Sequence, residues 1–209
     1  MNTMLTRLAT SLLLVLIIFL IIYLENIWIF SLAIFFVCIL GILEWVTNKF
    51  ENLLLGLFLI FGFGSCSILY VLINESFYLL YGLIIMNTAI FDTFAYVIGS
   101  KFGANFIVKK ISPNKTLEGL IGGIIGSIIF GLMCGHIFEI NFLPLIFMLG
   151  GFLAFIGDLL ISYFKRQSGV KDTGSILPGH GGILDRIDSH LISTPISVSY
   201  THLRAHETS

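Results

Sequence analysis

The sequence predicts an all-α integral membrane protein, a polytopic bundle of about six transmembrane helices. Of its 209 residues, 57% are hydrophobic and only 11% are charged, whereas about a quarter of the residues of an ordinary soluble domain are charged. The apolar residues form runs close to the roughly 20 residues that cross the hydrocarbon core of a bilayer. Between these runs, positive charge recurs at every second boundary. A soluble domain is therefore excluded, and the net charge of −1 says less than the placement of the charges.

The predicted spans come in three pairs, and each pair is joined by a short polar turn. Glu25 and Asn26 separate the first pair, residues 74–76 the second and residues 139–141 the third. Each run is near the length that a membrane helix needs. The expected spans are residues 8–24, 27–46, 52–73, 77–98, 119–138 and 142–164.

The charges in the loops predict an orientation. The turns within the pairs hold Glu25, Glu75 and Glu139 and neither Lys nor Arg, while the other boundaries carry the cations. Because cytosolic loops are enriched in Lys and Arg, the N-terminus and the polar segments 99–118 and 165–189 are expected in the cytosol.

Small residues recur at every fourth position in the fifth run. Gly119, Gly123, Ser127 and Gly131 have this spacing, which lets helix backbones approach closely. Tight helix packing is a sufficient explanation, so no chemistry is assigned to these glycines.

The end of the chain suggests a seventh span that is cut short. Residues 191–196 resemble the start of another membrane helix, but the following residues are polar and lack apolar periodicity. We therefore expect a membrane domain over residues 1–196 and a polar tail over residues 197–209, disordered or non-native. A natural short tail is the alternative.

The polar segment 157–189 stands out because it gathers carboxylates, cations and glycines in an otherwise apolar chain. Four of its side chains recur at helical spacing, so they share one face at the end of an apolar helix. They are Asp158, Ser162, Lys165 and Arg166. Carboxylates suit a hard cation such as Mg²⁺, Lys and Arg suit phosphate, and backbone N–H groups around glycines bind anions. The segment predicts a phosphate-handling metal site at the membrane surface.

Asp158 and Asp185 are the best candidates for metal ligands. Each is expected where an apolar helix meets the polar loop, and Mg²⁺ typically takes one or two carboxylates plus substrate phosphates. For either aspartate alone, a structural ion pair with Lys165, Arg166 or Arg186 would be an adequate explanation. Their occurrence in one segment around a glycine turn favours the metal role.

Asp92 is an ionisable residue in an apolar helix, near its expected cytosolic end. Such a residue indicates a functional site because burying it in the membrane is costly. The structural alternative is a carboxylate hydrogen-bonded to Thr88 or Tyr96, one turn away on the same face.

Lys115 is expected in the first turn of the fifth helix. Ser112 fits the N-cap and Pro113 the first helical position. A helix N-terminus that carries a lysine is suited to bind a phosphate. Snorkelling of Lys115 at the interface is the alternative.

These motifs together resemble a known family. The stretch SYFKRQSGVKDTGSILPGHGGILDRIDS is similar to the signature of the CTP:phosphatidate cytidylyltransferase family, also called CDP-diacylglycerol synthases. Upstream, DTFAYVIGSKFG and SPNKTLEG resemble that family's other two conserved blocks in order and separation. The resemblance spans residues 8–196 and is weak in the first two predicted helices, apart from Glu44 and Trp45.

The resemblance implies an enzyme that converts CTP and phosphatidic acid into CDP-diacylglycerol and pyrophosphate. It implies Mg²⁺ held by Asp158 and Asp185, with a second, monovalent cation left open, and a nucleotide site around Gly179, Gly181 and Gly182. His180 stays open between a base, a phosphate donor and a turn residue. The catalytic residues implied are Asp92, Lys115, Ser162, Lys165, Arg166, Lys171, Asp172, His180, Arg186 and Asp188.

The expected partners are CTP, phosphatidic acid and membrane lipids, without nucleic acid, and a homodimer is left open. The expected location is a bacterial inner membrane with the active site facing the cytosol. A CTP-dependent lipid-alcohol kinase is the alternative enzyme, since it would share cytosolic carboxylates and a lipid substrate. An ion-coupled transporter is less favoured, because its polar groups would lie near the bilayer midplane.

Overall fold

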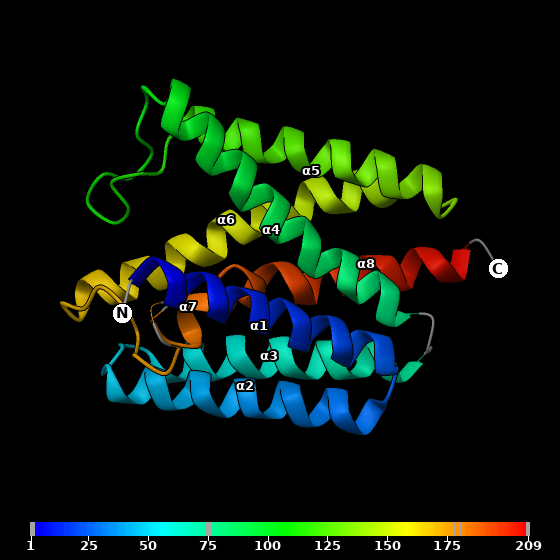
Figure 1. The fold of residues 1–209 in the computed structure, drawn as a ribbon, viewed down its shortest axis with the longest axis horizontal. Helices are drawn as coiled ribbons and strands as arrows, with labels where there is room; N and C mark the ends of the chain where they lie inside the picture. The colour runs from blue at the N-terminus through cyan, green and yellow to red at the C-terminus, as the bar shows by residue number, and fades with distance from the viewer. Residues whose placement is uncertain (1–2, 74–76, 178, 180, 208–209) are drawn as a thin grey trace.

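The protein is a bundle of helices, and the described residues contain no strand (Figure 1). The structure, a computed structural model, describes residues 3–73, 77–177, 179 and 181–207, with side chains from residue 7 to residue 201. The helices are α1 (Thr3–Leu24), α2 (Ile27–Thr47), α3 (Leu53–Ile73), α4 (Phe77–Phe102), α5 (Leu117–Ile137), α6 (Leu143–Gln167), α7 (Leu184–Ile187) and α8 (His190–Glu207).

Within the described residues, α1 to α6 are the six helices long and apolar enough to cross a membrane. This confirms the predicted all-α bundle. The largest differences from the predicted bounds are polar extensions, at the start of α1 and at the ends of α4 and α6. The predicted bounds were shorter because they followed the apolar residues alone, whereas helical hydrogen bonding continues into the polar residues beyond the membrane boundary.

The start of α5 differs from the prediction, which made Ser112 the N-cap and Pro113 the first helical residue. The helix begins at Leu117, and the Oγ1 of Thr116 caps it by accepting a hydrogen bond from the N–H of Gly119 at 3.1 Å. Phe106 and Thr116 pair as an isolated antiparallel bridge. Because this bridge occupies the backbone up to Thr116, helical hydrogen bonding cannot begin earlier.

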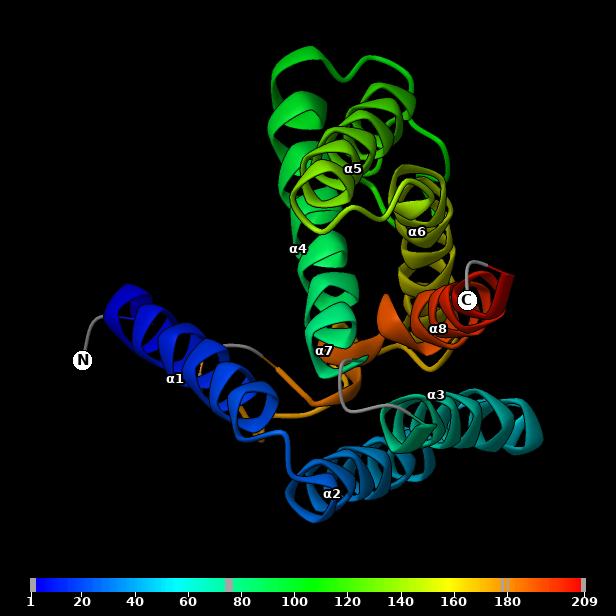
Figure 2. The same ribbon diagram turned by 90° about the vertical axis from the view of Figure 1, so that its right-hand side faces the viewer.

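The helices form two groups that α8 joins. In Figure 2, α4, α5 and α6 gather on one side, and α1, α2 and α3 run along the other. Helix α8 contacts both α6 and α3. The glycines in the first half of α5 lie directly against α4, since a Cβ added at Gly123 would be 2.6 Å from the ring of Phe91, whereas Gly131 lies against Pro144 of α6. The expected close approach of helix backbones is therefore present.

Residues 197–207 belong to α8 and are helical in this structure. Ser197, Val198 and Thr201 are buried, and the hydroxyl of Thr201 donates to the hydroxyl oxygen of Tyr70 at 2.9 Å. Residues 197–201 thus pack against the bundle in this structure. The expected division at residue 197, with a disordered or non-native tail, stays a prediction.

A compact aromatic cluster supports the end of the bundle that carries the signature segment. Trp45 of α2 is 1% exposed, and its ring packs against Phe50 and Phe164. Ile161 of α6 and Leu184 of α7 belong to the same cluster and are fully buried. The cluster fixes α2, α6 and α7 relative to one another, and α6 and α7 carry six of the predicted site residues.

Candidate active site

A cavity of about 280 Å³ opens between α4, α5 and α6. Three of the predicted site residues line it: Asp92 from α4, Lys115 from the loop before α5, and Asp158 from α6. Its walls also include the rings of Phe91 and Phe155. The fold therefore brings together charged residues from three segments that are far apart in the sequence.

Lys115 and Asp158 form an ion pair inside this cavity, with 2.5 Å between the Nζ and Oδ2 atoms. The Lys115 ammonium also lies over the ring of Phe155, 4.6 Å from its centroid. The hydroxyl of Ser162 donates to Oδ1 of Asp158 at 3.1 Å. Asp92 is close enough to interact electrostatically with both members of the pair.

The position of Asp158 differs from the prediction that it stands at the end of its helix. Helix α6 continues to Gln167, so Asp158 lies more than two turns inside it. The helix persists because its last turns pack Ile161 and Phe164 into the aromatic cluster. Asp158 consequently faces the cavity from within a helix rather than from a loop.

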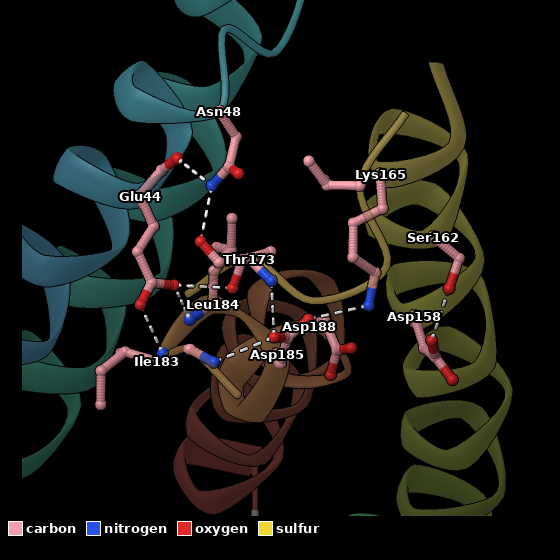
Figure 3. A network of polar contacts seen from close by, with 12 residues as sticks. Glu44, Asn48, Asp158, Ser162, Lys165, Thr173, Ile183, Leu184, Asp185 and Asp188 are labelled. Carbon is pink, nitrogen blue, oxygen red and sulfur yellow. Dashed lines mark hydrogen bonds and ion pairs between the residues drawn. The ribbon is translucent and has the colours of Figure 1, made fainter. Parts of the chain in front are cut away.

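Asp185 is held by three hydrogen bonds within the protein (Figure 3). The Lys165 ammonium donates to Oδ1 at 2.8 Å, and the backbone N–H groups of Thr173 and Gly182 donate to Oδ2 at 2.8 and 3.0 Å. Burial by itself would raise the pKa of Asp185, but these bonds outweigh it and lower the pKa. Asp185 is therefore an ionised carboxylate that ties α6 to both sides of the signature loop.

Asp188 follows α7 and has a different electrostatic environment. Burial, and then the negative charge of Asp158, raise its pKa to about 7. The N–H of Ser189 donates to its Oδ1 at 2.8 Å, and the charge of Lys165 partly opposes the shift. Asp158 and Asp188 thus repel each other across the site.

The carboxylates fit a divalent cation that takes few protein ligands. Among the described residues, no three His, Cys, Asp or Glu side chains gather closely enough to hold a metal. Mg²⁺ commonly uses one or two carboxylates and completes its shell with water and phosphate. A cation between Asp158 and Asp188 would relieve their repulsion. Both oxygens of Asp158 have protein partners, as do both oxygens of Asp185, but Asp185 already accepts from a cation and two backbone N–H groups. This donor set fits Asp158 with Asp188 better than the expected pair of Asp158 with Asp185, whose ligand role stays a prediction.

The structure adds Glu44 to the site, a residue to which the sequence reasoning gave no role. Its side chain is 4% exposed at the end of α2. It accepts hydrogen bonds from the Thr173 hydroxyl at 2.7 Å and from the backbone N–H groups of Ile183 and Leu184, both at 2.8 Å (Figure 3). A charged residue within an apolar run was the signal that could have found it.

The glycine turn differs from a simple phosphate cradle. The N–H of Gly182 donates to Asp185, and the next two N–H groups donate to Glu44, so these donors are not available to a phosphate in this conformation. Gly181 has φ +82°, a left-handed conformation that favours glycine. The expected nucleotide role of the turn stays a prediction, and His180 lies outside the described residues.

The remaining predicted residues lie on the outer side of the segment. The Arg166 side chain donates to the backbone carbonyl groups of Ile111 and Val170, at 3.1 and 3.4 Å, which ties α6 to the loop before α5. The other predicted residues here are exposed and do not line the cavity: Lys171, Asp172, Gly179 and Arg186. Their catalytic or nucleotide-binding roles stay predictions.

Comparison with known proteins identifies the family. A model of the cytidylyltransferase family matches residues 46–204. The chain belongs to this family. The match includes all of the predicted site residues, from Asp92 to Asp188, while Glu44 precedes it by two residues.

Curated relatives in the cytidylyltransferase family are similar over about half of this chain. A phosphatidate cytidylyltransferase of Thermotoga maritima is 42% identical over 125 residues, which are 55% of this chain and 46% of that protein. The phosphatidate cytidylyltransferase of Staphylococcus aureus (strain COL) is 44% identical over 126 residues, 57% of this chain and 46% of that protein. An uncharacterized protein of Escherichia coli, YnbB, is 44% identical over 108 residues, 50% of this chain and 36% of that protein. The matches thus cover less than half the length of these relatives.

Proposed function

We propose that the chain carries out phosphatidate cytidylyl transfer, in which CTP and phosphatidic acid give CDP-diacylglycerol and pyrophosphate. The observation that carries the proposal is the cavity where Lys115 and Asp158 form an ion pair, next to Lys165 and Asp188 of the signature segment. Both substrates bring phosphate groups, so the reaction needs positive charge and a cation site in one place. The family, and the phosphatidate cytidylyltransferases among its relatives, support the same activity.

The reaction needs no protein nucleophile. A phosphate oxygen of phosphatidic acid attacks the α-phosphorus of CTP, the bond from that phosphorus to the bridging oxygen breaks, and pyrophosphate leaves. The attacking phosphate is already anionic at neutral pH, so the residues must position two anions and offset their charge rather than remove a proton. In this proposal Lys115 and Lys165 exchange part of their pairing with Asp158 and Asp185 for substrate phosphates.

Mg²⁺ is the proposed cofactor, and when bound it would neutralise negative charge on the nucleotide phosphates. Asp158 and Asp188 are the residues whose mutual repulsion suits it. Asp185 would keep the Lys165 ammonium directed toward the phosphates, and Ser162 would fix the rotamer of Asp158 through its hydrogen bond. Asp92 completes the negative wall of the cavity, where it can orient Lys115.

The protein is an integral membrane protein, and we infer that the signature end faces the cytosol of a bacterial inner membrane. The inference is supported by loop charge, since Lys101 and Lys109 lie at this end and Glu139 at the other. CTP, the proposed second substrate, is also cytosolic. A homodimer stays a prediction.

Labelled CTP tests the proposal. The full chain, in vesicles that contain phosphatidic acid, diacylglycerol and a polyprenol, is supplied with Mg²⁺ and with CTP labelled at the α-phosphorus or, separately, at the γ-phosphorus. Cytidylyl transfer puts the α-label in the lipid and the γ-label in pyrophosphate. A lipid-alcohol kinase would put the γ-label into a diacylglycerol or polyprenol substrate. Transfer of the γ-label to lipid, or no lipid labelling from either CTP, would overturn the proposal.

A further inference from the structure

The buried carboxylate of Glu44 connects two parts of the signature loop that are separated by about ten residues. One contact is the hydroxyl of Thr173, at the start of the loop. The others are the N–H groups of Ile183 and Leu184, just after the glycine turn. Each of its two oxygens accepts at least one of these bonds, so the side chain holds both ends of the turn at once.

The backbone near Glu44 supplies a further bond to the same place. The side-chain amide of Asn48 donates both to the carbonyl oxygen of Glu44, at 2.7 Å, and to that of Thr173, at 2.6 Å. The end of α2 therefore contacts Thr173 at two points, the side-chain hydroxyl of Thr173 and the carbonyl group of Thr173. The start of the loop is thus fixed to α2 directly, in addition to its link to α6 through Asp185 and Lys165.

The loop is shaped to fit this carboxylate. A Cβ added at Gly174 would lie 2.7 Å from Oε1 of Glu44, and one added at Gly182 would collide with Oε2. Both glycines thus permit the loop backbone to approach Glu44 closely. This gives Gly182 a packing role, in place of the phosphate contact that its N–H cannot make here.

The contacts continue from Glu44 to the catalytic side chains. Thr173 and Gly182 both donate their N–H groups to Asp185, and Asp185 accepts from Lys165. Glu44 therefore fixes the two loop segments whose N–H groups orient Asp185, although it lies outside the cavity itself.

We propose that Glu44 is a positioning residue for the signature loop: it holds the loop so that Asp185 keeps the Lys165 ammonium directed toward the substrate phosphates. The proposal rests on the proposed function for its catalytic consequence, but the positioning of the loop can be measured without activity. Replacing Glu44 by Gln converts one acceptor oxygen into an NH₂ group that faces a backbone or hydroxyl donor, with little change in volume. At least one of the three bonds is then lost.

Limited trypsin digestion of the detergent-solubilised full chain is the first test, because Lys171 is exposed on the loop that Glu44 holds. We expect Glu44→Gln to be cleaved after Lys171 about tenfold faster than the wild type, since cleavage follows the population of the opened loop. Glu51→Gln is the matched control, as it removes an exposed carboxylate just beyond α2 and should leave cleavage unchanged.

Kinetics give the second test. Glu44→Gln should lower kcat about tenfold to a hundredfold while the KM for CTP changes less than about threefold, because the lost positioning matters chiefly in the transition state. Gly174→Ala should reproduce this pattern from the loop side. The losses in kcat of Glu44→Asp and Gly174→Ala should not multiply in the double variant, because both substitutions disturb the same contact between Glu44 and the loop backbone.

The possible outcomes test the positioning role of Glu44 and the proposed function separately. If Glu44→Gln is cleaved like the wild type and Glu51→Gln, the positioning role is wrong. If Glu44→Gln does not accumulate in membranes, the cleavage rates and kcat of Glu44→Asp and Gly174→Ala are compared with the wild type instead. If the losses in kcat of these two variants multiply in the double variant, the positioning role is wrong. If the wild type transfers no label from CTP to phosphatidic acid, the proposed function fails, and the cleavage rates alone decide the positioning.

Discussion

Replacing Asp185 by Asn is expected to destabilise the protein by about 3 kcal/mol, because it breaks a buried ion pair. The side chains of Lys165 and Asp185 are 11% and 6% exposed, and their charged atoms are 2.8 Å apart. The Asn oxygen can keep the two backbone hydrogen bonds of Oδ2, so the loss falls on the Lys165 ammonium, which then faces an NH₂ group. At this separation the direct attraction is about 6 kcal/mol at an effective dielectric constant near 20, and desolvation offsets about half of it.

Lys165→Met should cost less, about 2 kcal/mol, because Asp185 keeps its two backbone donors. In the double variant neither charge remains, so the cost should stay near 3 kcal/mol rather than reach the sum of the single costs, a coupling of about 2 kcal/mol.

Unfolding in mixed detergent micelles, followed by tryptophan fluorescence, measures these energies. Trp45 is buried 4.9 Å from the ring of Phe164, next to Lys165 in the chain. A Trp28→Phe background leaves it as the one remaining tryptophan, since the chain has two. A coupling below about 0.5 kcal/mol between Asp185→Asn and Lys165→Met in folded protein would refute the argument that this pair stabilises the signature loop.

Two further predictions concern the metal site and the helix packing. Asp158→Asn should lower CTP-to-lipid transfer by about 100-fold or more while the protein stays in the membrane, and raised Mg²⁺ should partly restore it; the exposed Lys110→Ala is the mild control, and near-normal activity would remove Asp158 from the site. Gly123→Ala should lower the thermal unfolding midpoint in detergent, because overpacking against α4 costs about 1–3 kcal/mol. Gly62→Ala should be neutral or stabilise the protein by about 0.5–1 kcal/mol, because a Cβ added at Gly62 meets nothing within 4 Å. Equal effects of the two alanines would contradict the close approach of α4 and α5.

The fold was largely predictable because the membrane restricts it to helices of set length. Apolar run length predicted all six spans, and glycine spacing predicted tight packing of the fifth helix, although not that its partner at Gly123 is α4. The start of α5 was wrong because Ser112 and Pro113 carry a local capping signal, while the bridge between Phe106 and Thr116 is a contact between segments that this signal does not encode. Local sequence cannot weigh such a contact.

The site was predictable as a set of residues but not as a set of pairs. Asp92, Lys115 and Asp158, which were predicted as site residues on separate grounds, do line one cavity. Their partners could not be derived, because the pairing of Lys115 with Asp158 depends on the crossing of α5 and α6. Glu44 was missed for the same reason, since the donors to its carboxylate lie in a segment more than a hundred residues later.

That separation has a consequence for how the protein is made. The donors to Glu44 follow it by 129, 139 and 140 residues. At about 5–20 residues per second, roughly 6–28 s pass between the synthesis of this carboxylate and that of the groups that satisfy it. During this interval its position at the end of α2, rather than mid-helix, allows water to hydrate the charge. Helices α1 to α5 can therefore enter the bilayer before the active site exists, and its completion is a step that follows membrane insertion.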